Sequence, residues 1–146
     1  MKIVSIAVSR KKGTTKTCVD QVKLIENHGI EGDAHAGDWH RQVSFLAAES
    51  IKRAETEDMP LNFGDFAENI ATTGIDWAAQ PIGQQVKLGH DTLLEITQIG
   101  KECHKKCAIF YRTGDCIMPK EGVFAKVLKG GIIKTGDMVE LVDKNR

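Results

Sequence analysis

Three of the four cysteines of the chain lie close together, and their neighbours suit thiol chemistry. They are Cys103, Cys107 and Cys116. The same segment carries four basic side chains, Lys101, Lys105, Lys106 and Arg112. Neighbouring cations stabilise a thiolate and lower the pKa of a cysteine, which makes it a nucleophile or a metal ligand. The same cations could also bind a phosphate or another oxyanion.

Three other interpretations of this segment remain open. A zinc site has four candidate ligands here, although not as the usual C-x2-C pairs: Cys103, His104, Cys107 and Cys116. A disulfide between Cys103 and Cys107 is possible in a turn but is disfavoured in the cytosol. The cysteines near residues 108–110 could also be small core residues. The isolated Cys18 is predicted to be a core residue of that kind.

A second polar cluster lies in a glycine-rich loop at residues 29–43. It contains His35, His40 and Arg41 among glycines and carboxylates. Glycines let a backbone approach a ligand closely, and loops on a rigid sheet often carry sites. The pattern favours a binding loop and a solvated turn about equally. A metal site of Asp33, His35 and His40 is a third possibility, but its spacing does not match the familiar helical zinc motifs.

Two weaker signals lie further along the chain. Glu68 and Asn69 stand in the stretch GDFAENIATTG at residues 64–74, where the pattern predicts a helical turn capped by Asp65. The glycine pair at residues 130–131, which precedes Lys134, predicts a hairpin that leads into the last strand.

The coarse pattern predicts a mainly β fold. Short runs of apolar and alternating residues predict strands at residues 2–9, 21–26, 42–46, 85–88, 92–99 and 138–142. The strands at 85–88 and 92–99 should pair as a hairpin. Helices are expected at residues 47–57 and 120–128. Many short strands and 14 glycines favour a β-barrel or sandwich with small helical additions.

Length and composition limit the classes of function. The 146 residues suggest one domain, residues 1–146. Twenty basic and twenty acidic residues give a net charge of zero, which argues against broad nucleic-acid binding. No segment has the roughly 20 apolar residues of a membrane span. The start of the chain does not have the order of a signal peptide, and four cysteines without a leader suggest a cytoplasmic protein.

The motifs together resemble the MOSC family, named for the C-terminal domain of molybdenum-cofactor sulfurases. The matching stretches are GIEGDAHAGDWHRQVSFLA, FGDFAENIATTGI, IGQQVKLG and QIGKECHKKCAIFYRTGDCIMPKEGVFAKVLKGG. They occur in the family's order and span about Met1 to Val142. The resemblance implies a closed, barrel-like β-sheet and a cleft for the molybdenum cofactor (molybdopterin). It also implies a cysteine that carries sulfur as a persulfide or ligates molybdenum.

The resemblance also implies roles for particular residues. Cys107 is the expected functional thiol and molybdenum ligand, with Cys103 as a second or resolving thiol. The sequence GKEC at residues 100–103 resembles the bacterial G-R-x-P-C, but Glu102 replaces the common proline. The implied cofactor-binding residues are His35, His40, Arg41, Glu68, Asn69, Lys101, Lys105, Lys106 and Arg112.

The implied function is cofactor binding and sulfur transfer, which leaves open whether the chain acts alone as an enzyme. The chain resembles the stand-alone form, so no pyridoxal phosphate is expected in it. A persulfide would then come from a cysteine desulfurase, and a molybdoenzyme is another possible partner. The alternatives are a molybdenum-dependent oxidoreductase of the amidoxime-reducing type and a non-catalytic, zinc-stabilised binding domain.

Overall fold

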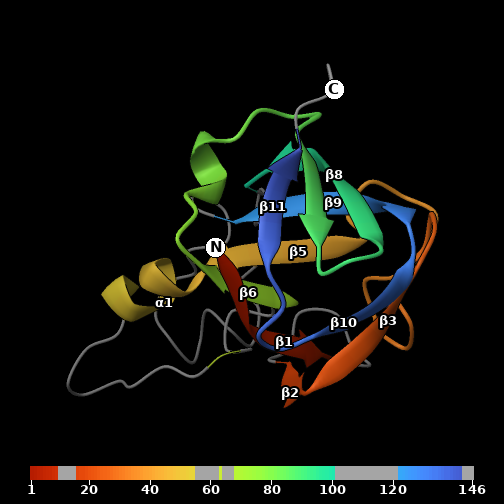
Figure 1. Cartoon of the computed structure of the whole chain (residues 1–146), viewed down its shortest axis with the longest axis horizontal. Helices are drawn as coiled ribbons and strands as arrows, with labels where there is room; N and C mark the ends of the chain where they lie inside the picture. Colours follow the sequence, from red (N-terminus) through yellow and green to blue (C-terminus); the bar gives the residue numbers. More distant parts are fainter. Residues whose placement is uncertain (10–15, 55–62, 64–67, 101–121, 143–146) are drawn as a thin grey trace, which may run out of the picture.

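The described residues fold into two β-sheets with one short α-helix (Figure 1). The computed structural model describes residues 1–9, 16–54, 63, 68–100 and 122–142. The larger sheet has eight strands in the order β11-β7-β8-β9-β5-β6-β1-β2, and the smaller has the order β10-β3-β4. The elements are β1 (Lys2–Val8), β2 (Thr17–Val19), β3 (Gln21–Ile25), β4 (Gly29–Ile30), β5 (Val43–Ala47), α1 (Ala48–Ala54), β6 (Ile70–Thr73), the 3-10 helix η1 (Trp77–Ala79), β7 (Gln85–Leu88), β8 (Thr92–Ile99), β9 (Val123–Lys129), β10 (Gly131–Lys134) and β11 (Val139–Val142).

The core lies against the centre of the larger sheet. Every residue of β5 is buried, because β9 pairs with it on one side and β6 on the other. Phe45 packs against the ring of Trp77 with 4.7 Å between centroids. The Trp77 Nε1–H donates to Thr72 Oγ1 at 2.8 Å, so this buried ring has its polar atom satisfied. The sequence VSFLA at residues 43–47, which is apolar except for Ser44, is thus typical of a fully buried strand.

Most predicted elements are confirmed. Strands occupy the predicted places at β1, β3, β5, β7, β8 and β11, and β7 pairs with β8 as the expected antiparallel hairpin. Helix α1 confirms the first part of the helix predicted at 47–57, whose last residues lie outside the described ones.

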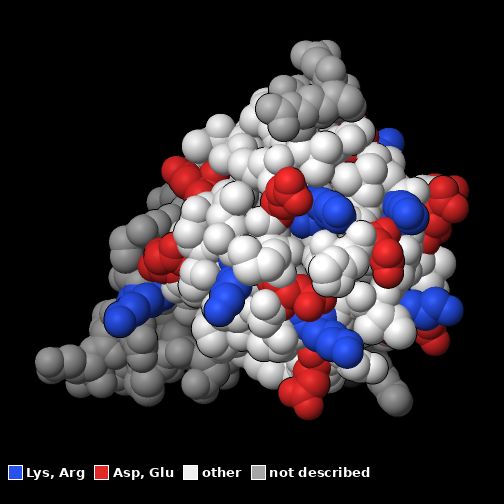
Figure 2. All heavy atoms as spheres, viewed as in Figure 1, with Lys and Arg blue, Asp and Glu red and all other residues white. Residues whose placement is uncertain are grey.

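Within the described residues no helix is long and apolar enough to cross a membrane. Figure 2 shows acidic and basic side chains interspersed on one face, as the balanced composition suggests.

Three predictions about the β-structure are wrong. The helix predicted at 120–128 is strand β9, because β8 and β5 flank it on both sides and Val123, Ala125 and Val127 are buried at every second position. The hairpin predicted from residues 130–131 does not form, because β10 pairs with β3 instead (Figure 1).

The predicted closed barrel is the third error, since neither sheet closes. The larger sheet ends at β11 and β2. Strand β2 occupies the free edge of β1 from Ile6 to Val8, which leaves only the start of β1 to approach β11. That approach is one isolated bridge between Lys2 and Met138.

Candidate functional site

The cysteine segment, residues 101–121, connects β8 to β9, and the two residues that flank it are hydrogen-bonded to each other. Gly100, after β8, donates its N–H to the carbonyl of Gly122, before β9, at 2.6 Å. Residues 101–121 between them lie outside the described part of the chain. This holds for six predicted site residues, namely Lys101, Cys103, Lys105, Lys106, Cys107 and Arg112. What the structure provides is the surroundings of the point where their segment starts and returns.

The glycine-rich loop is also closed at its base. Gln42, just before β5, donates from Nε2 to Asn27 Oδ1 at 3.1 Å and accepts from Val127 N–H at 2.9 Å. Gly29 has a φ of 122°, and a Cβ there would lie 2.7 Å from the Gln42 carbonyl oxygen. Only glycine fits such a close approach. The loop therefore projects from a rigid base beside β9.

The second half of this loop is linked through Gln98 to Gly100, the residue after which the cysteine segment starts. Gln98 Oε1 lies 2.9 Å from His40 Nε2 and accepts a hydrogen bond from Arg41 Nε at 3.0 Å. Gln98 Nε2 donates to the carbonyl of Gly100 at 2.8 Å. One side-chain amide thus links His40 and Arg41 to the residue that precedes position 101. Arg41 and Gly100 are 59 positions apart in the sequence, and the fold brings both to the side chain of Gln98.

Arg41 is held in place but keeps donors available. Its Cζ lies 5.8 Å from the ring centroid of Trp39 and 5.5 Å from that of Phe124, which are cation–π distances. Its Nε is bonded to Gln98. Among the described residues, Nη1 and Nη2 of Arg41 make no hydrogen bond or ion pair. A guanidinium fixed in this way suits the binding of an anion through its outer nitrogens.

The first half of the loop forms a buried ionic cluster. Lys16 Nζ lies 2.8 Å from Asp33 Oδ1, and both side chains have an exposed fraction of 0%. Lys16 Nζ also lies 3.1 Å from His35 Nδ1 and 3.3 Å from Ser9 Oγ. Asp33 accepts hydrogen bonds from the backbone N–H groups of Ser9 and His35, each at 3.1 Å. The carboxylate and the ammonium are therefore paired and hydrogen-bonded inside the protein.

The pKa of Asp33 reflects two opposing effects. Burial raises the pKa, because it disfavours the charged form. The hydrogen bond and the charge of Lys16, together with the N–H groups of Ser9 and His35, outweigh burial. The net result is a pKa of Asp33 below its ordinary value of 3.8.

The structure does not form the metal site considered for Asp33, His35 and His40. The Lys16 ammonium occupies the position between Asp33 and His35, and His40 bonds to Gln98 instead. The described residues contain no group of three or more histidines, cysteines or acidic residues placed to hold a metal.

Glu68 and Asn69 lie inside the sheet, each with 1% exposed. Asn69 Oδ1 accepts from Ser44 N–H at 2.9 Å and from Ser44 Oγ at 3.1 Å, and its Nδ2 donates to the Ala7 carbonyl at 3.1 Å. Asn69 therefore joins β1 to β5 at the start of β6, and the next residue, Ile70, is in that strand. The helical turn predicted within residues 64–74 falls partly outside the described residues, and the later part of that stretch forms strand β6 (Ile70–Thr73) instead.

One row of paired residues connects Arg41 to the far edge of the sheet. Gln98 pairs with Phe124, Phe124 pairs with Ser44, and Ser44 bonds to Asn69. Asn69 in turn accepts from Ala7 N–H, and Ala7 pairs with Cys18.

Cys18 is exposed, so its prediction as a core residue is wrong. It lies in the edge strand β2, where its Sγ is 3.4 Å from the Phe63 carbonyl oxygen.

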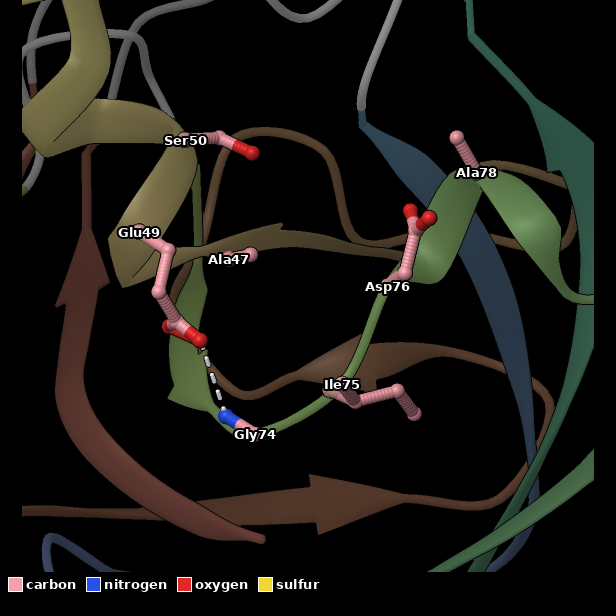
Figure 3. Close-up of a pocket in the computed structure, with 7 residues that line it drawn as sticks. All are labelled: Ala47, Glu49, Ser50, Gly74, Ile75, Asp76 and Ala78. Atoms are coloured by element: carbon pink, nitrogen blue, oxygen red, sulfur yellow. Dashed lines mark hydrogen bonds between the residues drawn. The ribbon is translucent and has the colours of Figure 1, made fainter.

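A separate cavity of about 490 Å³ lies between α1 and the turn after β6 (Figure 3). Glu49 and Asp76 line it with Ser50, and Glu49 Oε2 accepts from Gly74 N–H at 3.0 Å. It contains none of the predicted site residues. The residues around Arg41 are thus the better candidate for the functional site, because they place a fixed cation near Gly100, where the cysteine segment starts.

Sequence reasoning missed Lys16, Gln98, Trp39 and Phe124. Gln98 carried the clearest signal, because it is a polar residue in an apolar strand two positions before Gly100. Lys16 follows Lys11 and Lys12 in a polar stretch, and nothing local in the sequence distinguishes its buried ammonium from those of the neighbouring lysines.

Comparisons with known proteins agree with this architecture. The fold is similar to the YuaD protein of Bacillus subtilis, with a TM-score of 0.76, 16% identity, and 96% of this chain and 94% of that chain covered. It is also similar to YiiM from Geobacillus stearothermophilus (TM-score 0.74, 23% identity, 98% and 75% covered) and from Escherichia coli (TM-score 0.68, 20% identity, 99% and 71% covered).

A sequence relative is a protein named "Reductase" from Gibberella moniliformis, 31% identical over 133 residues. The match covers 80% of this chain but only 23% of that protein, so the chain spans about a quarter of its length. Residues 31–140 match the MOSC domain, which includes the glycine-rich loop, the cysteine segment and most of the larger sheet. The chain belongs to the MOSC domain family.

Proposed function

We propose that this chain binds the molybdenum cofactor and handles sulfur through a reactive cysteine, Cys107 with Cys103 as second thiol. The observation that carries the proposal is Arg41, whose guanidinium carbon lies 5.8 Å and 5.5 Å from the ring centroids of Trp39 and Phe124 and whose Nε donates to Gln98, two positions before Gly100. Its outer nitrogens make no hydrogen bond or ion pair with the described residues. An anionic ligand bound there would lie near the start of the segment that carries the thiols. Membership of the MOSC family supports the choice of ligand.

The residues present fit the chemistry of this cofactor. Arg41 supplies the fixed guanidinium that a phosphate needs, and Lys101, Lys105, Lys106 and Arg112 add positive charge in the adjacent sequence. His40 supplies a ring nitrogen for the polar edge of a pterin, whereas His35, whose Nδ1 contacts the Lys16 ammonium, supports the loop. Glu68 and Asn69 are buried, and Asn69 is hydrogen-bonded to Ser44. We therefore assign both residues a supporting role rather than direct contact with the cofactor.

Within this proposal the cysteine has one of two roles. When bound, the cofactor supplies molybdenum that accepts a soft thiolate ligand. As a sulfur carrier, the thiolate attacks the terminal sulfur of a donor persulfide, so a new S–S bond forms, the donor S–S bond breaks, and the donor leaves as a thiolate. A cysteine desulfurase in the cytoplasm is the proposed donor, which would present the persulfide that this step needs.

A molybdenum-dependent oxidoreductase is the second candidate. It is favoured by the 31% identity to the protein named "Reductase", although this chain corresponds to only 23% of that protein. A carrier would bind cofactor or sulfur reversibly, whereas a reductase would retain molybdenum and need an electron donor.

Three single variants test the role of the thiols: Cys107→Ser, Cys103→Ser and Cys116→Ser. Serine is nearly isosteric but cannot form a persulfide. We expect Cys107→Ser to abolish persulfide loading or molybdenum retention while the melting temperature stays close to that of the wild type. Cys103→Ser should have a milder effect, and Cys116→Ser the mildest.

The other outcomes discriminate the alternatives. Loss of loading in Cys103→Ser alone would reassign the functional thiol and keep the proposal. Full loading in all three variants would reject a reactive thiol. A large fall in melting temperature in each variant, with zinc in the purified wild type, would indicate a structural zinc site, because metal binding would then be coupled to folding.

A further inference from the structure

The side chain of Gln98 is directed toward the glycine-rich loop by an irregularity in β8. The register of β8 against β9 shifts between Ile96 and Gln98, which makes Thr97 an extra residue in the ladder. Such bulges re-aim the side chains that follow them and are common beside functional sites. The Thr97 hydroxyl donates to the carbonyl of His40. The main chain of His40 is therefore fastened to the same bulge that orients Gln98.

The hydrogen bonds of Gln98 fix which end of its amide faces the loop. Its Nε2 donates to the Gly100 carbonyl at 2.8 Å. Its Oε1 lies 3.0 Å from Arg41 Nε, which can only donate. Both contacts require the same orientation of the amide, so Oε1 faces Arg41 and His40.

That orientation determines the tautomer of His40. Its Nε2 is 2.9 Å from Gln98 Oε1, and a carbonyl oxygen only accepts hydrogen bonds. The proton of the neutral ring must therefore be on Nε2, which leaves Nδ1 as an acceptor. His40 is exposed, and no described residue is hydrogen-bonded to its Nδ1. Trp39 packs against the ring edge-to-face at 5.8 Å between centroids.

We propose that Gln98 is a positioning residue, which fixes His40 as the Nε2–H tautomer and aims the Arg41 guanidinium. The site then offers a ligand an acceptor, His40 Nδ1, and the outer donors of Arg41, on two side chains that Gln98 holds through His40 Nε2 and Arg41 Nε. These groups are complementary to a ligand that carries both an N–H or O–H and an anionic oxygen. The identity of that ligand as the molybdenum cofactor rests on the proposed function, whereas the positioning itself does not.

The tautomer can be measured without any ligand. Protein labelled with ¹⁵N-histidine would be examined at about pH 8, where an ordinary histidine with a pKa of about 6.5 is neutral. Two-bond ¹H–¹⁵N correlations distinguish the tautomers, and His40→Gln assigns the signal. We expect a protonated Nε2 at His40 in the wild type and in Gln98→Glu, whose carboxylate also accepts. The nearly isosteric Gln98→Met should give a mixture of both tautomers.

The controls separate positioning from a loss of fold. Gln84→Leu removes a glutamine that donates to Gln85 and Val142 and should leave the His40 signal unchanged. His35 is an internal reference, because its Nδ1 faces the Lys16 ammonium and not Gln98. A protonated Nδ1 at His40 in the wild type would overturn the proposal. So would a wild-type pattern in folded Gln98→Met. If Gln98→Met does not fold, the wild type and Gln98→Glu decide the question.

Binding of the molybdenum cofactor completes the test. We expect Gln98→Met to weaken binding about tenfold or more, as the loss of groups that orient ligand-binding residues typically does, and Gln98→Glu to bind more tightly than Gln98→Met. Equal affinity of the wild type and Gln98→Met would overturn the role of Gln98 toward the ligand. If the wild type has the expected tautomer but binds no cofactor, the proposed function fails while the positioning role stands.

Discussion

The two halves of the glycine-rich loop use similar residues for different ends. In the first half, Asp33 and His35 contact the ammonium of Lys16, and the carboxylate and the ammonium are fully buried. In the second half, His40 and Arg41 share one oxygen of Gln98, and the outer nitrogens of Arg41 make no hydrogen bond or ion pair with the described residues. Polar side chains that are paired inside the protein hold the loop. Polar side chains that are oriented but incompletely paired are those a ligand can use.

The largest effect should come from breaking the buried pair. Lys16→Met leaves the Asp33 carboxylate buried without its partner, and such a loss typically costs about 3–5 kcal/mol in the free energy of unfolding. Urea unfolding would measure it. The matched control is Lys126→Met, because Lys126 and Glu95 form a 3.4 Å pair with side chains 41% and 20% exposed. That variant should lose at most about 1 kcal/mol. Similar losses in both variants would remove the distinction between the two kinds of pair.

The double variant Lys16→Met with Asp33→Leu sharpens this result. It replaces the pair by apolar side chains, which is often neutral or stabilising relative to the intact pair. We expect it to be clearly more stable than Lys16→Met alone. A double variant that is less stable than either single variant would show that the cluster contributes through packing and not through the pairing of charges.

A smaller effect is expected when the exposed half is changed. Arg41→Ala should weaken cofactor binding roughly ten- to a hundredfold, because a charge-assisted contact typically contributes about 1.5–3 kcal/mol. Its melting temperature should change little. Arg41→Lys keeps the charge but loses the planar group that makes cation–π contacts with Trp39 and Phe124, so an intermediate affinity is expected. A large fall in melting temperature with unchanged affinity would assign Arg41 to the structural half instead.

The pH dependence of stability should differ between the wild type and Asp33→Asn. The folded pKa of Asp33 lies below 3.8, so its carboxylate stabilises the fold above that pH and loses this contribution as the pH falls through the lower folded pKa. Wild-type unfolding free energy should therefore fall steeply with pH below about 4. Asp33→Asn, less stable at neutral pH, should show a shallower fall. Equal slopes in urea unfolding between pH 6 and pH 3 would contradict the paired carboxylate.

Cys18 should give the smallest effect. It lies exposed in an edge strand, and substitutions at such positions usually change stability by less than about 0.5 kcal/mol. Cys18→Ala should therefore unfold like the wild type and load sulfur like it. A loss above about 2 kcal/mol, the range of large-to-small changes in a core, would restore the interpretation of Cys18 as a core residue.

The sequence predicted the strands where the apolar pattern is local and failed where pairing partners decide. The strand predicted at residues 42–46 forms as β5, whose side chains are apolar except for Ser44 and are all buried. Val123, Val127, Phe124 and Leu128 fit a helical spacing, but they also fit the alternation of a strand between two neighbours. The outcome depended on β8 and β5, which no local pattern contains.

The candidate site was predictable in part for the same reason. His40 and Arg41 could be singled out from the glycines and charges around them. Gln98 is visible in the sequence as a polar residue in an apolar strand, but its role is not, because that role depends on a bulge at Thr97 that brings it to a loop 57 positions earlier in the chain. The buried state of Lys16 likewise depends on Asp33, 17 positions later.

The most direct test of the central claim is the metal content of the protein after incubation with the molybdenum cofactor. Wild type, Arg41→Ala and the control Lys126→Met would be freed of unbound cofactor and analysed for molybdenum and zinc. The account predicts molybdenum retained by the wild type and by Lys126→Met, and largely lost from Arg41→Ala. Equal retention by Arg41→Ala, or a wild type that holds zinc and no molybdenum, would contradict it.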